Sequence, residues 1–215
     1  MDVSFLKWID HAGFMLEING KKVYIDPFRI RGSLPRADVI FLTHTHIDHF
    51  NEEDLKKIET PQTKFVAPME TAGKLGRRTV MAVEPGKSYG VGGISFSTVR
   101  AYNESKQFHP KVNNWVGYVI EAGGRRVYHA GDTDAIEEMR KVDADIALLP
   151  VGGNYTMDVS EAAKAAELIN AKAFAPMHYK SLLGKQGYKK AEEEFMQKVK
   201  NSIVLEQIEE PYYSF

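Results

Sequence analysis

The stretch THTHIDHF, residues 43–50, places three of the chain's seven histidines and one aspartate within six positions. It continues the apolar run ADVIFL, which predicts a buried β-strand. Residues two apart in an extended segment project to the same side, so His44 and His46 can reach one metal ion together. Asp48 and His49 follow where the strand has ended and the chain turns, so they can face a second ion.

Capping of the next helix does not explain this cluster. The segment EEDLKKIE predicts a short helix at residues 52–59, and Asn51 alone would cap it. A group of surface histidines without a common role is the remaining alternative. Imidazole ligands suit zinc, iron and nickel, and a carboxylate ligand suits zinc or manganese. Residues 43–50 therefore predict metal binding.

A site for two ions needs further ligands from elsewhere in the chain. Asp132 follows the strand RVYHA and Gly131, whose backbone freedom permits a sharp turn, and one carboxylate can bridge two ions. Asp134 competes for this role, although an acid in the first turn of the next helix is its favoured interpretation. His178 ends the buried strand AFAPM, with a satisfied core histidine as its alternative. His109 lies in the loop NESKQFHPK, with an exposed loop residue as its alternative.

The composition limits the classes of protein to consider. With 215 residues, of which 43% are hydrophobic, the chain can build a core, and we expect one domain over residues 1–215. Its 28 basic and 29 acidic residues give a net charge of −1, so nothing draws it to nucleic acid or anionic membranes. Without cysteine, it must bind any metal through nitrogen and oxygen. The sequence has no secretory signal pattern and no membrane-spanning apolar stretch, so we expect a cytoplasmic protein with a small-molecule substrate, for which a homo-oligomer is one option.

Short strand and helix patterns alternate along the chain, in a similar order in its two halves. Asn19-Gly20 predicts a hairpin turn, and Asp158 with Glu161 predicts a capping box. Two sheets packed face to face, with helices outside, would bury all of the apolar faces, so we expect an α/β protein. The expected strands lie at residues 3–9, 14–18, 22–26, 37–44, 64–68, 79–83, 93–102, 115–122, 126–130, 145–151, 173–178 and 202–208. The expected helices lie at residues 52–59, 69–76, 135–141, 159–169 and 188–200.

The chain resembles the metallo-β-lactamase superfamily of metal-dependent hydrolases. The His-x-His-x-Asp-His signature lies at residues 44–49, Gly131-Asp132 and His178 follow in the family's order, and YIDP at residues 24–27 resembles its early strand. HAGDTD, LLPVGGNYTMD and PMHY resemble a small branch that includes ascorbate-6-phosphate lactonases and N-acyl-phosphatidylethanolamine phospholipases. The resemblance implies a four-layer αββα sandwich with a two-metal site along one edge.

The resemblance also implies a ligand set. This set comprises His44, His46 and a third histidine for the first ion, Asp48, His49 and His178 for the second ion, and Asp132 as the bridge. In many relatives the third histidine directly follows the strand that ends here in VRAYN, where this chain has Tyr102 and Asn103. His109 is the nearest substitute, and without it the first site would be weak or the protein mononuclear. Two divalent ions are implied, zinc first, with manganese, iron or nickel as alternatives.

The implied reaction is hydrolysis. Two ions about 3.5–4 Å apart lower the pKa of a shared water, and the resulting metal-bound hydroxide would attack a small ester, lactone or phosphodiester. Asp48 would orient this hydroxide by accepting its hydrogen bond. His11 is expected to support a ligating imidazole, and Asp26 is expected to support His44 or His46 in the same way. The candidates to protonate the leaving group, each with a structural role as its alternative, are His11, Tyr102, His129 and Tyr179.

Other interpretations remain open. Arg29, Arg31 and Arg36 form a basic loop that could meet an anionic group of the substrate, although a solvated loop is favoured. The run WVGYV at residues 115–119 is assigned to the core. An iron-dependent sulfur or oxygen redox enzyme and a catalytically silent metal-dependent binding protein are the alternative functions. Oxygen-reducing di-iron relatives have glutamate where this chain has His46, which argues against that subgroup, whereas sulfur-oxidising relatives keep the histidines.

Overall fold

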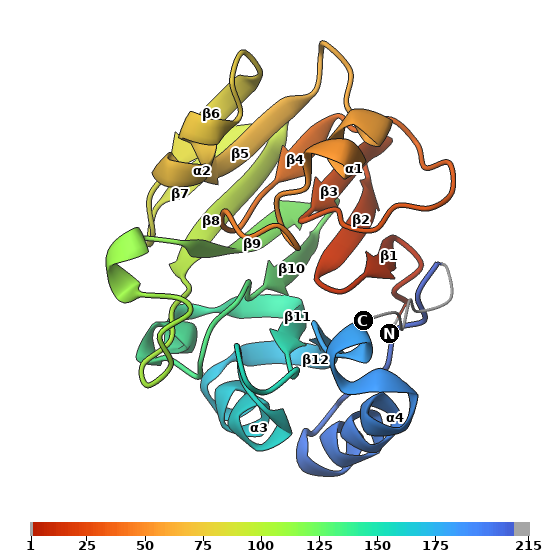
Figure 1. Ribbon diagram of the computed structural model, residues 1–215, viewed down its shortest axis with the longest axis vertical. Coiled ribbons are helices and arrows are strands. Elements are labelled where there is room, and N and C mark those ends of the chain that lie inside the picture. Colours follow the sequence, from red (N-terminus) through yellow and green to blue (C-terminus); the bar gives the residue numbers. More distant parts are fainter. Residues whose placement is uncertain (1, 209–215) are drawn as a thin grey trace.

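Two six-stranded mixed sheets pack face to face in the computed structural model, which describes residues 2–208 (Figure 1). The first sheet has the order β1-β2-β3-β4-β5-β6 and the second β12-β11-β10-β9-β8-β7. The strands are β1 Leu6–Asp10, β2 Gly13–Ile18, β3 Lys21–Ile25, β4 Val39–Phe41, β5 Lys64–Pro68, β6 Thr79–Val83, β7 Ser88–Val91, β8 Ile94–Arg100, β9 Val116–Ala122, β10 Arg125–His129, β11 Asp143–Pro150 and β12 Asn170–Met177. The helices are α1 Glu52–Ile58, α2 Met69–Lys74, α3 Val159–Leu168 and α4 Lys180–Lys198, with 3₁₀ helices η1 Lys111–Asn113 and η2 Glu137–Lys141.

Helices cover the outer faces of both sheets. In Figure 1, α1 and α2 lie over the first sheet, and α3 and α4 lie below the second. In β4, Val39 and Phe41 belong to the core between the sheets, whereas Ile40 belongs to the core that α1 closes with Leu55 and Ile58. Both faces of β4 are therefore apolar, which explains its continuous hydrophobic run. The expected α/β architecture with helices outside two sheets is confirmed.

Several local predictions are also confirmed. Asn51 caps α1, because its side chain accepts hydrogen bonds from two backbone N–H groups of the first turn. Asp158 and Glu161 form the capping box of α3. Asn19 and Gly20 have left-handed φ angles of 52° and 76° in the turn between β2 and β3, as a tight hairpin requires.

Several elements differ from the sequence-based prediction. Strand β7 was not expected, because the glycines at positions 90, 92 and 93 give the only signal there, and they indicate a turn. The segment before β11 forms the 3₁₀ helix η2 instead of an α-helix. Helix α4 begins at Lys180 instead of Tyr188, and it is interrupted at Gly184, which has a φ angle of 64°. Gly184 separates the first turn from the rest of the helix, and the predicted segment lies entirely after it.

The expected strand at residues 202–208 is absent as a strand. This segment forms isolated bridges from Ser202 to Phe174 and from Gln207 to Trp8. Phe174 lies on an edge strand of one sheet and Trp8 on an edge strand of the other. The segment therefore runs from the edge of one sheet to the edge of the other and forms a single bridge with each.

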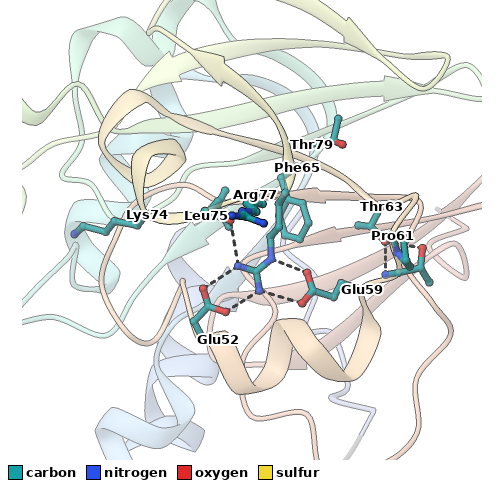
Figure 2. Close-up of a pocket in the computed structure, with 12 residues that line it drawn as sticks. Glu52, Glu59, Pro61, Thr63, Phe65, Lys74, Leu75, Arg77 and Thr79 are labelled. Carbon is teal, nitrogen blue, oxygen red and sulfur yellow. Dashed lines mark hydrogen bonds and ion pairs between the residues drawn. The ribbon is translucent and has the colours of Figure 1, made fainter.

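A polar cavity of about 720 Å³ lies between α1 and β6 and contains none of the predicted site residues (Figure 2). Arg78 donates hydrogen bonds to Glu52 at 2.7 and 2.9 Å and to Glu59 at 2.6 and 3.0 Å. Its guanidinium also lies 5.5 Å from the ring centroid of Phe65. This cluster ties both ends of α1 to the segment that precedes β6.

The sandwich brings the carboxyl ends of several strands to one edge. His11 and His178 directly follow β1 and β12 there, and His44 and Asp132 lie three residues beyond the ends of β4 and β10. Among residues 2–208, none of the helices combines the length and the hydrophobicity that a membrane span requires.

Candidate metal centre

The predicted ligands, from separate segments of the chain, lie together at this edge. Three groups of side chains each bring their ligand atoms within 4.8 Å of one another, which is close enough to hold a metal ion. The groups are His44, His46 and His109; His11, Asp48, His49 and His178; and His44, His49 and Asp132.

The first group contains only imidazoles. His44 Nε2 lies 3.0 Å from His46 Nδ1, and the His109 ring centroid lies 5.2 and 5.0 Å from those of His44 and His46. His109 therefore reaches back from its loop to the other two histidines, and at 1% exposure it is not the exposed loop residue of the alternative interpretation.

Asp132 lies between the first group and the second. Its Oδ2 is 3.2 Å from His109 Nε2 and 3.1 Å from His178 Nε2, and its Oδ1 is 3.3 Å from His49 Nε2. The carboxylate is buried. One side chain thus contacts ligand candidates of both groups, which is the arrangement that a bridging carboxylate needs.

Asp26 and Thr43 organise the floor of the centre. Asp26 Oδ1 accepts from the Thr43 N–H at 2.8 Å, and its Oδ2 accepts from the Thr43 hydroxyl at 2.6 Å and from His49 Nδ1 at 2.7 Å. A proton held at Nδ1 leaves His49 Nε2 free to bind a cation. Gly131 lets the neighbouring segment approach, since it has a φ of 66° and a Cβ there would lie 3.3 Å from Thr43 Cβ.

Several atoms of the centre are buried without a hydrogen-bond partner. These atoms are His49 Nε2, His109 Nε2, His178 Nε2 and Asp132 Oδ1. Buried polar atoms without partners are uncommon and costly, and cations between the two groups would satisfy them. The donor set of nitrogen and oxygen fits zinc, and manganese or iron as well. The residues present therefore fit metal ions.

The carboxylates of the buried Asp132 and the partly buried Asp48 stay ionised. Burial alone would raise the pKa of Asp132, but the His178 and His49 imidazoles hold it well below its usual range. Burial likewise opposes the charge on Asp48, but His49 and the His11 hydrogen bond lower its pKa far more. Two negative charges therefore remain at neutral pH where cations would bind.

His11 also belongs to this centre. Its backbone has a left-handed φ of 53°, its Nε2 lies 3.0 Å from Asp48 Oδ2, and its Nδ1 lies 3.2 Å from Ser181 Oγ. The rings of His11 and His178 lie 3.7 Å apart between centroids. Among the residues suggested to protonate a leaving group, His11 is the one that contacts the ligand candidates.

The other suggested proton donors point elsewhere. The Tyr102 hydroxyl lies 3.2 Å from Glu138. The Tyr179 hydroxyl donates to Glu192. His129 is buried at the end of β10, where its Nε2 contacts a backbone carbonyl at 2.8 Å. Hydrogen bonds away from the ligand atoms therefore hold these three side chains.

The basic loop lies beside the centre. Arg29 and Arg31 line a cavity of about 260 Å³ together with Phe28, whose ring centroid is 6.0 Å from that of His11. Arg36 turns away and donates to a backbone carbonyl of α1 at 2.6 Å.

Trp115 is a wall of the centre that sequence reasoning missed. Its ring centroid lies 4.8 Å from that of His44 and 4.9 Å from that of His46. Its Nε1–H donates to Glu70 Oε2 at 2.9 Å. The run WVGYV gives no signal for this role, because a strand of apolar residues looks the same in any core.

Asn103 and Asp134 form a second missed contact. Asn103 Oδ1 lies 2.9 Å from His109 Nδ1, and Asn103 Nδ2 donates to Asp134 Oδ1 at 3.0 Å. The expectation that Asp134 lies in the first turn of a helix was wrong, because η2 begins only at Glu137 and the carboxylate binds the preceding loop. The signal for Asn103 was its position where many relatives have a histidine.

Comparisons with known proteins identify the family. A model of the beta-lactamase superfamily domain matches residues 5–178, the range that contains all of the predicted ligands. The chain is 34% identical over 193 residues to a UPF0173 metal-dependent hydrolase of Pyrococcus abyssi, covering 81% of this chain and 84% of the relative. It is 34% identical over 188 residues to one of Caldivirga maquilingensis, covering 82% of each.

A solved structure agrees as well. The crystal structure of a candidate metal-dependent hydrolase from Parabacteroides distasonis superposes with a TM-score of 0.81 at 30% identity, and it covers 94% of this chain and 92% of that one. From its sequence, fold and clustered ligands, the chain belongs to the metal-dependent hydrolases of the beta-lactamase superfamily.

Proposed function

We propose that the chain is a two-metal cytoplasmic hydrolase, with zinc as the first metal to test, that cleaves a small ester, lactone or phosphodiester. The observation that carries this proposal is the position of Asp132, whose carboxylate lies 3.1–3.3 Å from imidazole nitrogens of both ligand groups. The first ion would be held by His44, His46 and His109, and the second by Asp48, His49 and His178.

Bound ions of this kind lower the pKa of a shared water and polarise the oxygen of the attacked group. The chain's own residues orient the reactants. The Asp48 side chain is 32% exposed, whereas that of Asp132 is 3% exposed, so Asp48 is the carboxylate that meets incoming solvent. His11 fixes Asp48 Oδ2 at 3.0 Å. Because its pKa is held below the usual range, Asp48 orients a water by accepting a hydrogen bond and does not store its proton.

Trp115 would limit the access of water to the first group. Its indole covers two of the imidazoles at 4.8 and 4.9 Å, and Glu70 fixes its orientation through the Nε1–H. An apolar wall lowers the local dielectric constant and so strengthens the interactions of the ligands with a cation.

The test is an assay on the purified protein after metal removal and reconstitution with zinc, manganese, iron or nickel in parallel. Substrates would be panels of lactones, carboxylic esters, thioesters and phosphodiesters. We expect hydrolysis of at least one class with metal and none after chelation. Oxygen consumption during turnover of the iron form would contradict the proposal and favour redox chemistry. A fully loaded protein inactive on every panel would contradict the substrate class.

A further inference from the structure

His109 is a ligand candidate on the loop between β8 and η1, whereas His44, Asp132 and His178 lie within three residues of the strands that precede them. It lies nine residues beyond β8, which ends at Arg100, and two residues before η1. Ordering such a loop costs conformational entropy. Only one of the two ring nitrogens can face an ion, so the loop and the tautomer must both be held.

Asn103 contacts His109 at three places. The Asn103 N–H donates to the His109 carbonyl at 2.8 Å. Asn103 Oδ1 accepts from the His109 N–H at 3.1 Å and from Nδ1 at 2.9 Å. The backbone bonds close the loop, and the side-chain bond places the proton on Nδ1. His109 Nε2, which lies 3.2 Å from Asp132 Oδ2, is then left with its lone pair.

The Asn103 amide is itself fixed. Its Nδ2 donates to Asp134 Oδ1 at 3.0 Å and to the Tyr155 carbonyl at 3.2 Å. Asp134 in turn accepts from the Glu104 N–H at 2.9 Å and from Lys106 Nζ at 2.7 Å. If the Asn103 amide were rotated by 180°, its N–H₂ group would face the N–H groups of His109, and its oxygen would face the Asp134 carboxylate. Asp134 therefore determines that the amide oxygen meets His109.

We propose that Asn103 is a positioning residue that makes His109 the third ligand of the first ion, with Asp134 as the anchor of its amide. The inference rests on the two-ion centre proposed above.

Metal titration of the apoprotein tests this inference without any measurement of turnover. Asn103→Ala is expected to lower the affinity for the first ion by about 10–100-fold, the usual effect of losing a residue that orients a ligand. The affinity for the second ion should change by less than threefold. In the cobalt-substituted protein, the visible absorption of one site should change and that of the other should remain. Asn170→Ala is the matched control, because it also removes an amide donor to an aspartate, Asp143 at 3.0 Å, at the opposite end of β12.

An exchange of side chains keeps the test valid if the alanine variant folds poorly. Asn103→Asp keeps an acceptor for His109 but sets a second carboxylate against Asp134. The double variant Asn103→Asp/Asp134→Asn restores a donor and an acceptor, and it should recover at least tenfold in the affinity of the weakened ion.

The two proposals fail in different ways. A wild-type chain that binds only one ion contradicts the two-ion centre. In that case, Asn103→Ala must still lower the affinity for that ion for the present inference to stand. Wild-type affinities in Asn103→Ala, equal losses at both sites, or a double variant no better than Asn103→Asp would each overturn it.

Discussion

Asp26→Asn is the substitution that most sharply tests how the centre is organised. The Asp26 carboxylate is fully buried and accepts hydrogen bonds from the Thr43 N–H, the Thr43 hydroxyl and His49 Nδ1. An asparagine of the same shape offers one acceptor oxygen and one N–H₂ group. If the N–H₂ faces His49, the imidazole must move its proton to Nε2, the atom that would bind the ion. If it faces Thr43, it meets another N–H donor.

The size of the effect follows from these contacts. Loss of a partner that orients a ligating histidine weakens metal binding by about 10–100-fold, which corresponds to about 1.4–2.8 kcal/mol. A buried donor left without an acceptor costs about 1–3 kcal/mol of stability. Asp26→Asn is therefore expected to weaken the ion held by His49 and to lower the free energy of unfolding of the apoprotein as well.

The assay is competition for zinc with a chromophoric chelator, together with chemical denaturation of the apoprotein. Asp38→Asn is the matched control, because Asp38 is exposed and accepts one backbone hydrogen bond at 2.8 Å, so its metal affinities should stay within twofold of wild type. Folded Asp26→Asn protein that binds both ions with wild-type affinity would refute the reasoning.

Other perturbations have equally definite outcomes. Asp132→Ala should bind less than one ion per chain by elemental analysis and should lose at least about 100-fold in turnover, more than an orienting partner costs; retained turnover would exclude a bridging role. Carboxylates raise the pKa of His49 well above its usual value and that of His178 to about 9, both against the effect of burial. Metal uptake at pH 7 should therefore release protons, and affinity should fall as the pH drops below 9; calorimetry in two buffers of different ionisation enthalpy measures this, and uptake without release would contradict it. Arg78→Met should lower the free energy of unfolding by about 1–2 kcal/mol, a value discounted because part of the ion-pair cluster is exposed to solvent. Metal content should be unchanged. A midpoint of urea denaturation equal to that of wild type would show that the cluster adds no stability.

Local chemistry explains which parts of the fold could be predicted. Asn51, Asn19-Gly20 and the Asp158 capping box act within a few residues, so their effects are visible in the sequence. The segment at residues 202–208 has the composition of a strand, but whether it pairs depends on sheet edges contributed by distant residues. Its two single bridges could not be inferred from the chain alone.

The same distinction holds at the centre. The spacing of residues 44–49 predicts ligands because an extended backbone sets which side chains share a side. The roles of Trp115 and Asn103 depend on which side chains meet once the sheets have packed. The fully buried Asp26 was expected to support His44 or His46, but it contacts His49 directly, since the turn after β4 brings that residue back over β3.

The most direct test of the central claim is a crystal structure of the zinc-reconstituted protein with anomalous scattering recorded at the zinc edge. We expect two peaks about 3.5–4 Å apart, with Asp132 in contact with both. The nitrogen ligands should divide into His44, His46 and His109 on one ion and His49 and His178 on the other. A single peak, or two peaks that Asp132 does not join, would contradict the account.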